Sequence, residues 1–306
     1  MNPLLLTNPK WDDYALIDSG NGKKLERFGR FSFSRPEPQA FWNSRLPSNE
    51  WSKISGEFIS SSSTNNDEII GKWSLEKNLP KKWEINFDNL KFYATPTPFR
   101  HLGFFPDQSP HWLWAAKKIK LHQQLFSKKT PVKMLNLFGY SGVASLHAAV
   151  NGAKVTHIDA SKKAINFAFE NRNLSSFEHL PIKFITDDAV KFVQREIRRN
   201  NKYDAIILDP PKYGRGPNGE KWELFKDLPF LLNLIPQILS KKPLFIILNS
   251  YAIRASYLSL HHALKDVMQG FPGSVQSGEL CITEEQKNPR QISTAIFARW
   301  DGQQIN

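Results

Sequence analysis

The stretch LDPPKYGRG (208–216) begins at the last residue of an apolar run, YDAIIL (203–208), and combines an aspartate with two consecutive prolines. Proline fixes its own φ and restricts the residue before it, so Asp209 and Pro210 have few backbone conformations open to them. The Asp209 carboxylate and the Pro210 carbonyl are therefore predicted to be two fixed acceptors that can orient an amino group. Tyr213 adds a face on which a base can stack. The alternative is a rigid loop that merely ends a strand.

A glycine-containing turn precedes a second carboxylate at a predicted strand end. In LNLFGYSGV (135–143), a strand is expected to end at Phe138, and Gly139 and Gly142 let the chain turn into a helix. The next strand is expected to end at Asp159, 20 residues after Gly139. Such glycines allow close backbone approach to a ligand, and the acid can accept hydrogen bonds from ribose hydroxyls. The pattern predicts a nucleoside site, although an ordinary strand–helix turn remains the alternative.

A third predicted strand ends at Asp187 and Asp188, with Ala189 beginning a helix. Asp188 is also suited to cap that helix. The carboxyl ends of parallel strands form the ligand-binding edge of open α/β sheets, so Asp159, Asp188 and Asp209 are expected at one edge. Each could be a helix cap by itself, but three in the same position favour a binding site.

These side chains need parallel strands to bring them together, and the chain after residue 130 alternates strand and helix as a parallel sheet requires. Predicted strands are 132–138, 153–159, 182–187, 203–209 and 243–250, with helices at 143–151, 161–174, 189–200, 224–239 and 254–268. Two further strands, 273–283 and 293–300, are expected to be antiparallel neighbours.

The first part of the chain has a different composition, rich in aromatic residues and serine. Its Asn21-Gly22 and Asp88-Asn89 pairs predict hairpin turns. We therefore predict a small β-rich N-terminal domain over residues 1–90, which could contribute to RNA contacts, and a second domain over residues 91–306.

Amino-acid composition limits which class of partner and which cellular compartment are expected for this protein. The 41 Lys and Arg against 29 Asp and Glu give a net charge of +12, which favours polyanions and nucleic acid first, although a generally basic proteome would also explain it. No apolar run is long enough to span a membrane, and the N-terminal segment lacks the basic flank of a signal peptide. The single cysteine, Cys281, fits a reducing cytoplasm. The histidines at 101, 111 and 122 lack a metal-site spacing, so no metal is predicted.

The ordered set of motifs resembles a known family. NLFGYSG (136–142), DDA (187–189) and DPPKYGRG (209–216), with HLGFFPDQ (101–108) upstream, are similar to the motifs of class I S-adenosylmethionine-dependent methyltransferases. The bacterial group related to the large-subunit ribosomal RNA cytosine-5 and guanine-N7 methyltransferases is the most similar. The resemblance covers about residues 90–300. It implies S-adenosylmethionine as cofactor and a Rossmann-like, seven-stranded, mostly parallel sheet with an antiparallel final strand pair.

The resemblance also implies roles for individual residues. Residues 136–142 would wrap the methionine end, Asp159 would hold the ribose, and Asp188 with Ala189 would meet the adenine. The catalytic residues would be Asp209, which would lie beside the reactive methyl, Pro210 and Tyr213. The full set expected to bind the cofactor is Asn136, Phe138, Gly139, Ser141, Gly142, Asp159, Ala160, Asp188, Ala189 and Asp209.

Two other groups of residues are candidates for substrate binding. Lys212 and Arg215 are expected on a mobile basic loop that meets phosphates, or else on a solvated charged loop. Arg100 and Gln108 lie in an aromatic-rich segment, 94–114, whose composition suits stacking on nucleotides and clamping them. The alternative for this segment is an aromatic domain interface.

The sequence departs from the cytosine-5 methyltransferases at the nucleophile. Those enzymes need a thiolate, placed after the fourth or fifth strand, to make the ring carbon reactive. Here these places read DPPKYGRG and LNSYA, and Cys281 is expected to be a small buried residue in a later strand. Direct transfer to nitrogen or oxygen needs alignment alone. We predict methylation of an RNA base, in ribosomal RNA, without a covalent enzyme intermediate. A methyltransferase acting on a protein or small molecule, and a nucleic-acid-binding module with an inactive cofactor site, remain alternatives.

Overall fold

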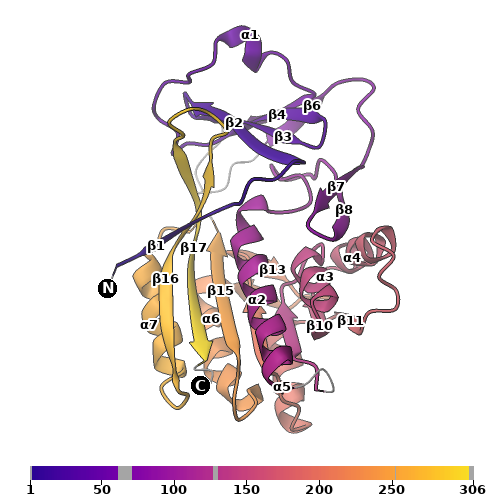
Figure 1. Cartoon of the computed structure of the whole chain (residues 1–306), viewed down its shortest axis with the longest axis vertical. Helices are drawn as coiled ribbons and strands as arrows, with labels where there is room; N and C mark the ends of the chain where they lie inside the picture. The colour runs from indigo at the N-terminus through magenta and orange to yellow at the C-terminus, as the bar shows by residue number, and fades with distance from the viewer. Residues whose placement is uncertain (1, 61–70, 127–129, 252, 303–306) are drawn as a thin grey trace. The chain divides into compact units, whose positions relative to one another are not determined.

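The computed structural model describes residues 2–60, 71–126, 130–251 and 253–302. The chain forms two compact units (Figure 1). Unit 1 comprises residues 1–6, 111–280 and 295–306, and unit 2 comprises residues 7–110 and 281–294. The sequence pattern did not indicate that residues 281–294 group with the N-terminal part of the chain. A division into separate domains near residue 90 stays a prediction.

Unit 1 is built on an eight-stranded sheet with the strand order β1-β16-β17-β15-β12-β9-β10-β11. Strands β15, β12, β9, β10 and β11 are parallel neighbours, and β17 runs antiparallel to β15. The predicted seven strands are all present in the mostly parallel arrangement. The strand bounds are β1 Leu4–Thr7, β9 Lys133–Leu137, β10 Lys154–Asp159, β11 Ile182–Thr186, β12 Ala205–Leu208, β15 Phe245–Tyr251, β16 Gly273–Thr283 and β17 Gln291–Gly302.

Strand β1 is an eighth strand, which was not predicted from the sequence. It occupies the edge of the sheet beside β16, and four residues are too few to show a periodic pattern. Gly278 permits the close approach, because a Cβ atom there would lie 1.9 Å from the carbonyl oxygen of Leu4.

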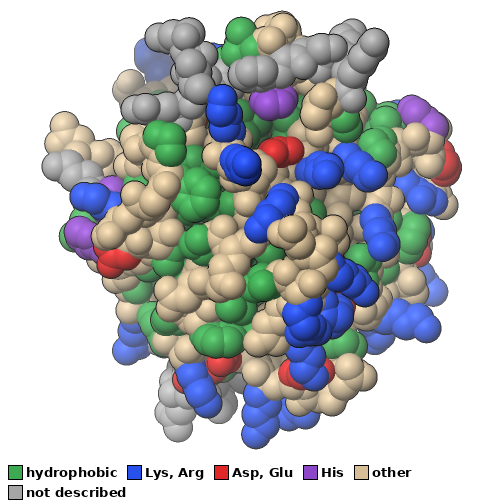
Figure 2. All heavy atoms as spheres, turned by 90° about the horizontal axis from the view of Figure 1, so that it is seen from below, with side chains coloured by type: hydrophobic (Ala, Val, Ile, Leu, Met, Phe, Trp, Pro, Cys, Tyr) green, Lys and Arg blue, Asp and Glu red, His purple; other side chains and the backbone are tan. Residues whose placement is uncertain are grey.

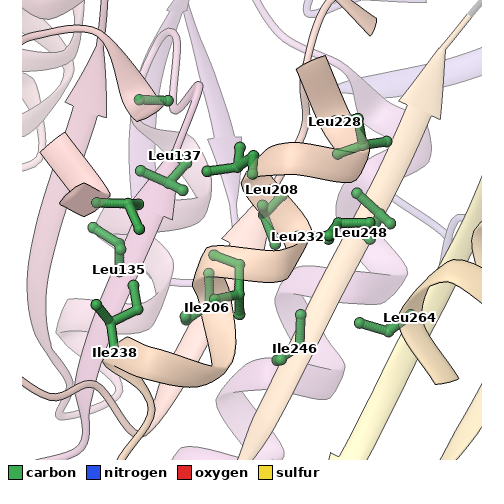
Figure 3. Close-up of a cluster of buried hydrophobic side chains, with 14 of the residues drawn as sticks. Leu135, Leu137, Ile206, Leu208, Leu228, Leu232, Ile238, Ile246, Leu248 and Leu264 are labelled. Carbon is green, nitrogen blue, oxygen red and sulfur yellow. The ribbon is translucent and has the colours of Figure 1, made fainter. Parts of the chain in front are cut away.

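Helices cover both faces of this sheet. Because strand side chains alternate between faces, Leu135 and Leu137 join a cluster with α5, α6 and α7 (Figure 3). Met134 joins a second cluster with α2 and α3. The helix bounds are α2 Ser109–Phe126, α3 Val143–Val150, α4 Lys162–Leu174, α5 Ala189–Arg198, α6 Leu224–Leu234 and α7 Tyr257–Val267.

Two helical segments differ from the predicted ones. Helix α2 was not predicted, since its sequence mixes Trp and His with lysines and shows no clear apolar face. The predicted helix over 224–239 ends at Leu234 and continues as a 3-10 helix, η2 (Ile235–Ile238). Pro236 lacks the N–H that an α-helical hydrogen bond at this point would need.

Unit 2 contains a five-stranded sheet in the order β2-β3-β4-β5-β6 and the hairpin β7-β8. Both predicted hairpin turns are confirmed: Asn21 and Gly22 have φ values of 54° and 75°, and Asp88 has a φ of 51°. The element bounds are β2 Tyr14–Gly20, β3 Lys23–Phe28, β4 Phe31–Pro36, α1 Ser48–Trp51, β5 Gly56–Ser60, β6 Gly71–Leu75, β7 Trp83–Phe87, β8 Leu90–Ala94 and η1 Pro106–Gln108.

Candidate functional site

The register of the parallel strands aligns the predicted site residues along one edge of the sheet. Leu137 at the end of β9 pairs with Ile158 on one side and with Leu208 on the other. The residues that follow these three, Phe138, Asp159 and Asp209, therefore lie in one row on neighbouring strands, which are spaced about 4.8 Å apart. Leu208 also pairs with Leu248, so Asn249 of β15 continues the row. The strand pairing thus brings together residues that are up to 111 positions apart in the sequence.

The turn between β9 and α3 has an unusual backbone. Phe138, Tyr140 and Gly142 have φ values of 59°, 48° and 81°, in the left-handed region that L-residues rarely adopt. Each such non-glycine residue costs about 1 kcal/mol or more and persists only where its surroundings fix it. Such strain gathers at ligand sites, so this turn is the first candidate for a binding loop.

Both glycines of this turn are required by packing. A Cβ atom on Gly139 would lie 2.3 Å from Cε1 of His157, and one on Gly142 would lie 2.8 Å from Cβ of Ala168. The turn therefore rests directly on strand β10 and helix α4. Ser141 is buried, and its carbonyl accepts a hydrogen bond of 2.8 Å from Nδ2 of Asn171 on α4.

A buried polar chain lies beneath the turn. The amide of Asn136 donates to Oγ of Ser145 at 2.9 Å, and that oxygen lies 2.9 Å from Nδ1 of His157. Burial lowers the pKa of His157 to about 3, so this histidine is neutral at physiological pH. Asn136 is 2% exposed, and its predicted contact with the cofactor stays a prediction. Ser145 and His157 were not predicted, because only the three-dimensional packing places them under the glycines.

The carboxylate of Asp159 is held by the two loops beside it. Oδ2 accepts the backbone N–H of Tyr140 at 2.9 Å, and Oδ1 accepts that of Ser161 at 2.8 Å. Burial raises the pKa of Asp159, and the two backbone N–H groups offset part of that rise. A carboxylate has about four acceptor positions, so each oxygen can still accept a ribose hydroxyl. Ala160, the next residue, is half-buried.

The carboxyl end of β11 is hydrogen-bonded to that of β10. The backbone N–H of Asp187 donates to the Asp159 carbonyl at 3.0 Å, and the Asp187 carboxylate forms an ion pair with Arg195. Asp188 caps α5 by accepting the N–H of Lys191 at 2.9 Å, as predicted. Ala189 is buried in the core cluster of this face. Asp188 is thereby fixed beside the row of strand ends.

The Asp-Pro-Pro segment continues into a β-hairpin, where a loop was expected. After half-buried Asp209 and buried Pro210, β13 (Tyr213–Arg215) pairs antiparallel with β14 (Lys221–Glu223). Gly219, with a φ of 88°, makes the turn. This corrects the expected loop: Arg215 lies in β13, and Lys212 immediately precedes that strand and accepts the N–H of Leu224 through its carbonyl. The Gly-Pro-Asn-Gly turn signal in residues 216–219 could have revealed it.

Trp222, which was not predicted from the sequence, connects the hairpin to the Asp-Pro-Pro segment and to the glycine turn. Its indole N–H donates to the Pro211 carbonyl at 2.8 Å, and its ring lies 4.8 Å from that of Phe138 in the glycine turn. Trp222 is 7% exposed, whereas Tyr213 on the opposite face of the hairpin is 56% exposed. The Lys212 ammonium lies 5.5 Å from the centre of the Tyr213 ring. The aromatic face expected for a base is therefore open to solvent.

The remaining predicted substrate residues belong to unit 2. The carbonyl of Arg100 accepts a hydrogen bond of 2.9 Å from Arg35, and Gln108 is 7% exposed in η1. Their contacts with substrate stay predictions. Cys281 is 3% exposed, which confirms the expected burial. In the part of the chain that the structure describes, no group of three metal-ligating side chains is found, and no helix is long and apolar enough to cross a membrane.

Positive charge is concentrated in unit 1. It carries 25 Lys and Arg against 14 Asp and Glu, a net charge of +11, whereas unit 2 carries 16 against 15, a net charge of +1. Figure 2, which views the molecule from below, shows many Lys and Arg side chains and few Asp and Glu. Unit 1 therefore accounts for almost the whole basic character of the chain.

Comparisons with known proteins agree with the fold and with a methyltransferase. The family model "Conserved hypothetical protein 95" matches residues 118–224, which contain the glycine turn and all three strand-end carboxylates. A crystal structure of the SAM-dependent methyltransferase from Agrobacterium tumefaciens is 42% identical, with a TM-score of 0.91, and the match covers 99% of this chain and 95% of that one. The chain therefore belongs to the S-adenosylmethionine-dependent methyltransferases.

Other relatives match over part of their length. The ribosomal RNA large subunit methyltransferase K/L of Shewanella frigidimarina is 35% identical over 153 residues, which is 49% of this chain and 20% of that protein. The chain spans between a fifth and about a third of the length of the curated relatives that it matches first. The complex of aTrm5 with tRNALeu has a TM-score of 0.53 at 12% identity, covering 97% of this chain and 73% of that one, and shows the fold alone.

Proposed function

We propose that this protein transfers a methyl group from S-adenosylmethionine to a base of large-subunit ribosomal RNA, without a covalent enzyme intermediate. The observation that carries the proposal is the row of strand ends, in which the strained glycine turn, Asp159 and Asp209 are aligned by strand register. Ligands of open α/β sheets bind at this edge. The names of the partly matching relatives support ribosomal RNA as the substrate.

The residues present fit the cofactor. The turn 136–142 would hold its methionine end, the free acceptor positions of Asp159 its ribose, and Asp188 with Ala189 its adenine. The bound cofactor supplies an activated methyl group on a sulfonium centre. Asp209, Pro210 and Tyr213 would then orient the acceptor base, with Tyr213 stacking on it. Lys212, Arg215, Arg100 and Gln108 are the proposed contacts to the rest of the substrate.

The absence of cysteine from the site favours direct transfer. The positions after β12 and β15 hold Asp209 and Asn249, and buried Cys281 lies in β16. Alignment of two reacting groups alone can lower a barrier by about 7–11 kcal/mol, so a nitrogen or oxygen acceptor needs no enzyme nucleophile. The excess charge of unit 1 supports a polyanionic substrate over a neutral small molecule.

The test is transfer of labelled methyl from S-adenosylmethionine into ribosomal RNA taken from a strain that lacks the gene. Digestion to nucleosides and mass spectrometry then identify the modified base and atom. We expect one labelled nucleoside, methylated on nitrogen or oxygen. Label in protein or small molecules instead of RNA would favour the alternative substrates, and cofactor binding without any transfer would favour an inactive module.

A further inference from the structure

The β13–β14 hairpin places two positive charges directly opposite each other. Its strand pairing matches Arg215 with Lys221. Hydrogen bonds of 2.8 Å from Gly216 N–H to the Glu220 carbonyl and of 3.0 Å from Leu224 N–H to the Lys212 carbonyl lie at the two ends of the ladder. Because bonded and non-bonded pairs alternate in an antiparallel ladder, Arg215 and Lys221 form a non-hydrogen-bonded pair, whose side chains lie closest together.

This arrangement costs stability unless an anion lies nearby. Arg215 and Lys221 are both exposed, and like charges in directly opposed positions destabilise a strand pair. Among the described residues, no ion pair joins either side chain to an acid. The acid nearest in the chain, Glu220, pairs instead with Lys191 on α5 at 2.5 Å. Within the described part of unit 1, neither cation is therefore paired with an acid.

The inner face of the same hairpin holds this surface in place. Trp222 bonds to the Pro211 carbonyl and packs on Phe138, and the ion pair between Glu220 and Lys191 joins the hairpin turn to α5. The two cations are therefore presented at a fixed position beside the site. Tyr213 shares their outer face, because it is two residues from Arg215 on the same strand.

We propose, building on RNA as the substrate, that Arg215 and Lys221 together bind one backbone phosphate of a single-stranded segment whose neighbouring base stacks on Tyr213. A shared phosphate removes the repulsion between the two cations, and Arg can donate two parallel hydrogen bonds to it while Lys adds a point charge. Glu223 lies opposite Tyr213 and repels a phosphate there, which favours the Arg215–Lys221 end of the hairpin. Stacking on an aromatic ring tolerates any base, so this contact grips the strand without reading its sequence.

The experiment measures binding of a fluorescent uridine dodecamer, U12, as a function of salt. The variants are Arg215→Gln, Lys221→Gln and the double variant. Lys154→Gln is the matched control, since Lys154 is exposed and begins β10 at the opposite end of the strands. We expect each hairpin variant to bind U12 about tenfold more weakly, with the control within twofold of wild type. Calorimetry with S-adenosylmethionine and thermal melting should show unchanged cofactor binding and no loss of stability.

The salt dependence tests whether the phosphate is shared. A plot of log K against log salt has a negative slope, and for single strands its magnitude decreases by about 0.7 for each phosphate contact removed. If the two cations share one phosphate, the slope of the double variant should be smaller in magnitude than that of wild type by about 0.7 in total. A loss of about 1.4, or an equal effect of Lys154→Gln, would overturn the shared site.

Methyl transfer into ribosomal RNA separates this proposal from the proposed function. Suppose that wild type methylates the RNA and that the hairpin variants have the same KM for RNA as wild type. This result would overturn the phosphate site and leave the proposed function intact. Failure of wild type to bind U12 under conditions in which it methylates ribosomal RNA would also overturn it, because the contact reads no sequence. Absence of transfer by wild type to any RNA would instead count against the proposed function.

Discussion

The two units use charge in different ways. Unit 1 has a net charge of +11 and presents most of its lysines to solvent, whereas unit 2 has a net charge of +1 and buries ion pairs. In unit 2, Lys24 pairs with Glu37 and Arg35 pairs with Glu26, and all four side chains are at most 8% exposed. These two buried pairs of unit 2 therefore serve the fold, whereas most lysines of unit 1 are exposed and available to a partner.

The network around Glu26 shows how unit 2 keeps charge in its interior. Tyr14 donates to Oε1 of Glu26 at 2.8 Å, and Nε of Arg35 donates to Oε2 at 2.7 Å. Burial opposes ionisation of Glu26, but Arg35 and Lys24 together with these hydrogen bonds hold its pKa below the ordinary value. The balanced charge of unit 2 gives little support to the expectation that this part supplies a large RNA-binding surface. Its RNA contacts stay a prediction.

The largest effect that we expect is the loss of a buried pair in unit 2. Glu26→Ala leaves the Arg35 guanidinium buried without its carboxylate, which typically costs 3–5 kcal/mol. Glu50→Ala is the control, because Glu50 forms an exposed pair with Lys53 and should cost less than about 1 kcal/mol. Chemical denaturation of both variants measures the difference. If both variants lost the same small amount of unfolding free energy, the buried pair of Glu26 with Arg35 would not contribute to the stability of unit 2.

The next largest effect concerns catalysis in unit 1. Asp209→Ala should fold normally and lose at least about 100-fold in kcat, because even small misalignment of reacting groups is costly in rate. Cys281→Ala should keep full activity, since direct transfer needs no thiolate. Both rates are measured by methyl incorporation at saturating cofactor. An inactive but folded Cys281→Ala variant, combined with a covalent RNA adduct trapped by wild type alone, would replace direct transfer by attack on a pyrimidine ring.

Prediction from sequence succeeded where one strand or turn carries its own signal. The apolar runs predicted the parallel strands β9, β10, β11, β12 and β15 of the unit 1 sheet, and the Asn21-Gly22 pair predicted its hairpin. Prediction failed where packing between segments distant in the sequence determines the position of a strand or side chain. Strand β1 packs beside β16 at Gly278, which lacks the Cβ that would clash with Leu4, and His157 lies under Gly139 because two strands pair in one register. Trp222 was not predicted for the same reason, since its partners Pro211 and Phe138 lie in different segments.

A smaller effect should separate a functional acid of unit 1 from the structural acids of unit 2. Asp159→Ala removes a charge-assisted acceptor for a ribose hydroxyl, so the cofactor should bind about 1.5–3 kcal/mol more weakly. The turn also loses the contacts to Tyr140 and Ser161, so thermal melting must be measured beside calorimetry. Asp159→Asn is a milder variant that keeps one acceptor oxygen and should bind at an intermediate strength. Equal cofactor affinity of all three proteins would exclude Asp159 from the cofactor site.

The smallest expected effect compares the exposed charge of the two units directly, because the two variants remove the same number of lysines from each unit. Lys162→Gln with Lys163→Gln removes two exposed lysines at the start of α4 in unit 1, and Lys77→Gln with Lys81→Gln removes two exposed lysines from unit 2. If unit 1 supplies the RNA surface, the first pair should weaken RNA binding a few-fold and lower the salt slope by up to about 1.4, while the second pair changes neither. Exposed lysines contribute little to folding, so both proteins should melt near the wild-type temperature. Equal loss of slope in the two proteins would mean that the RNA surface extends over both units despite the near-zero net charge of unit 2.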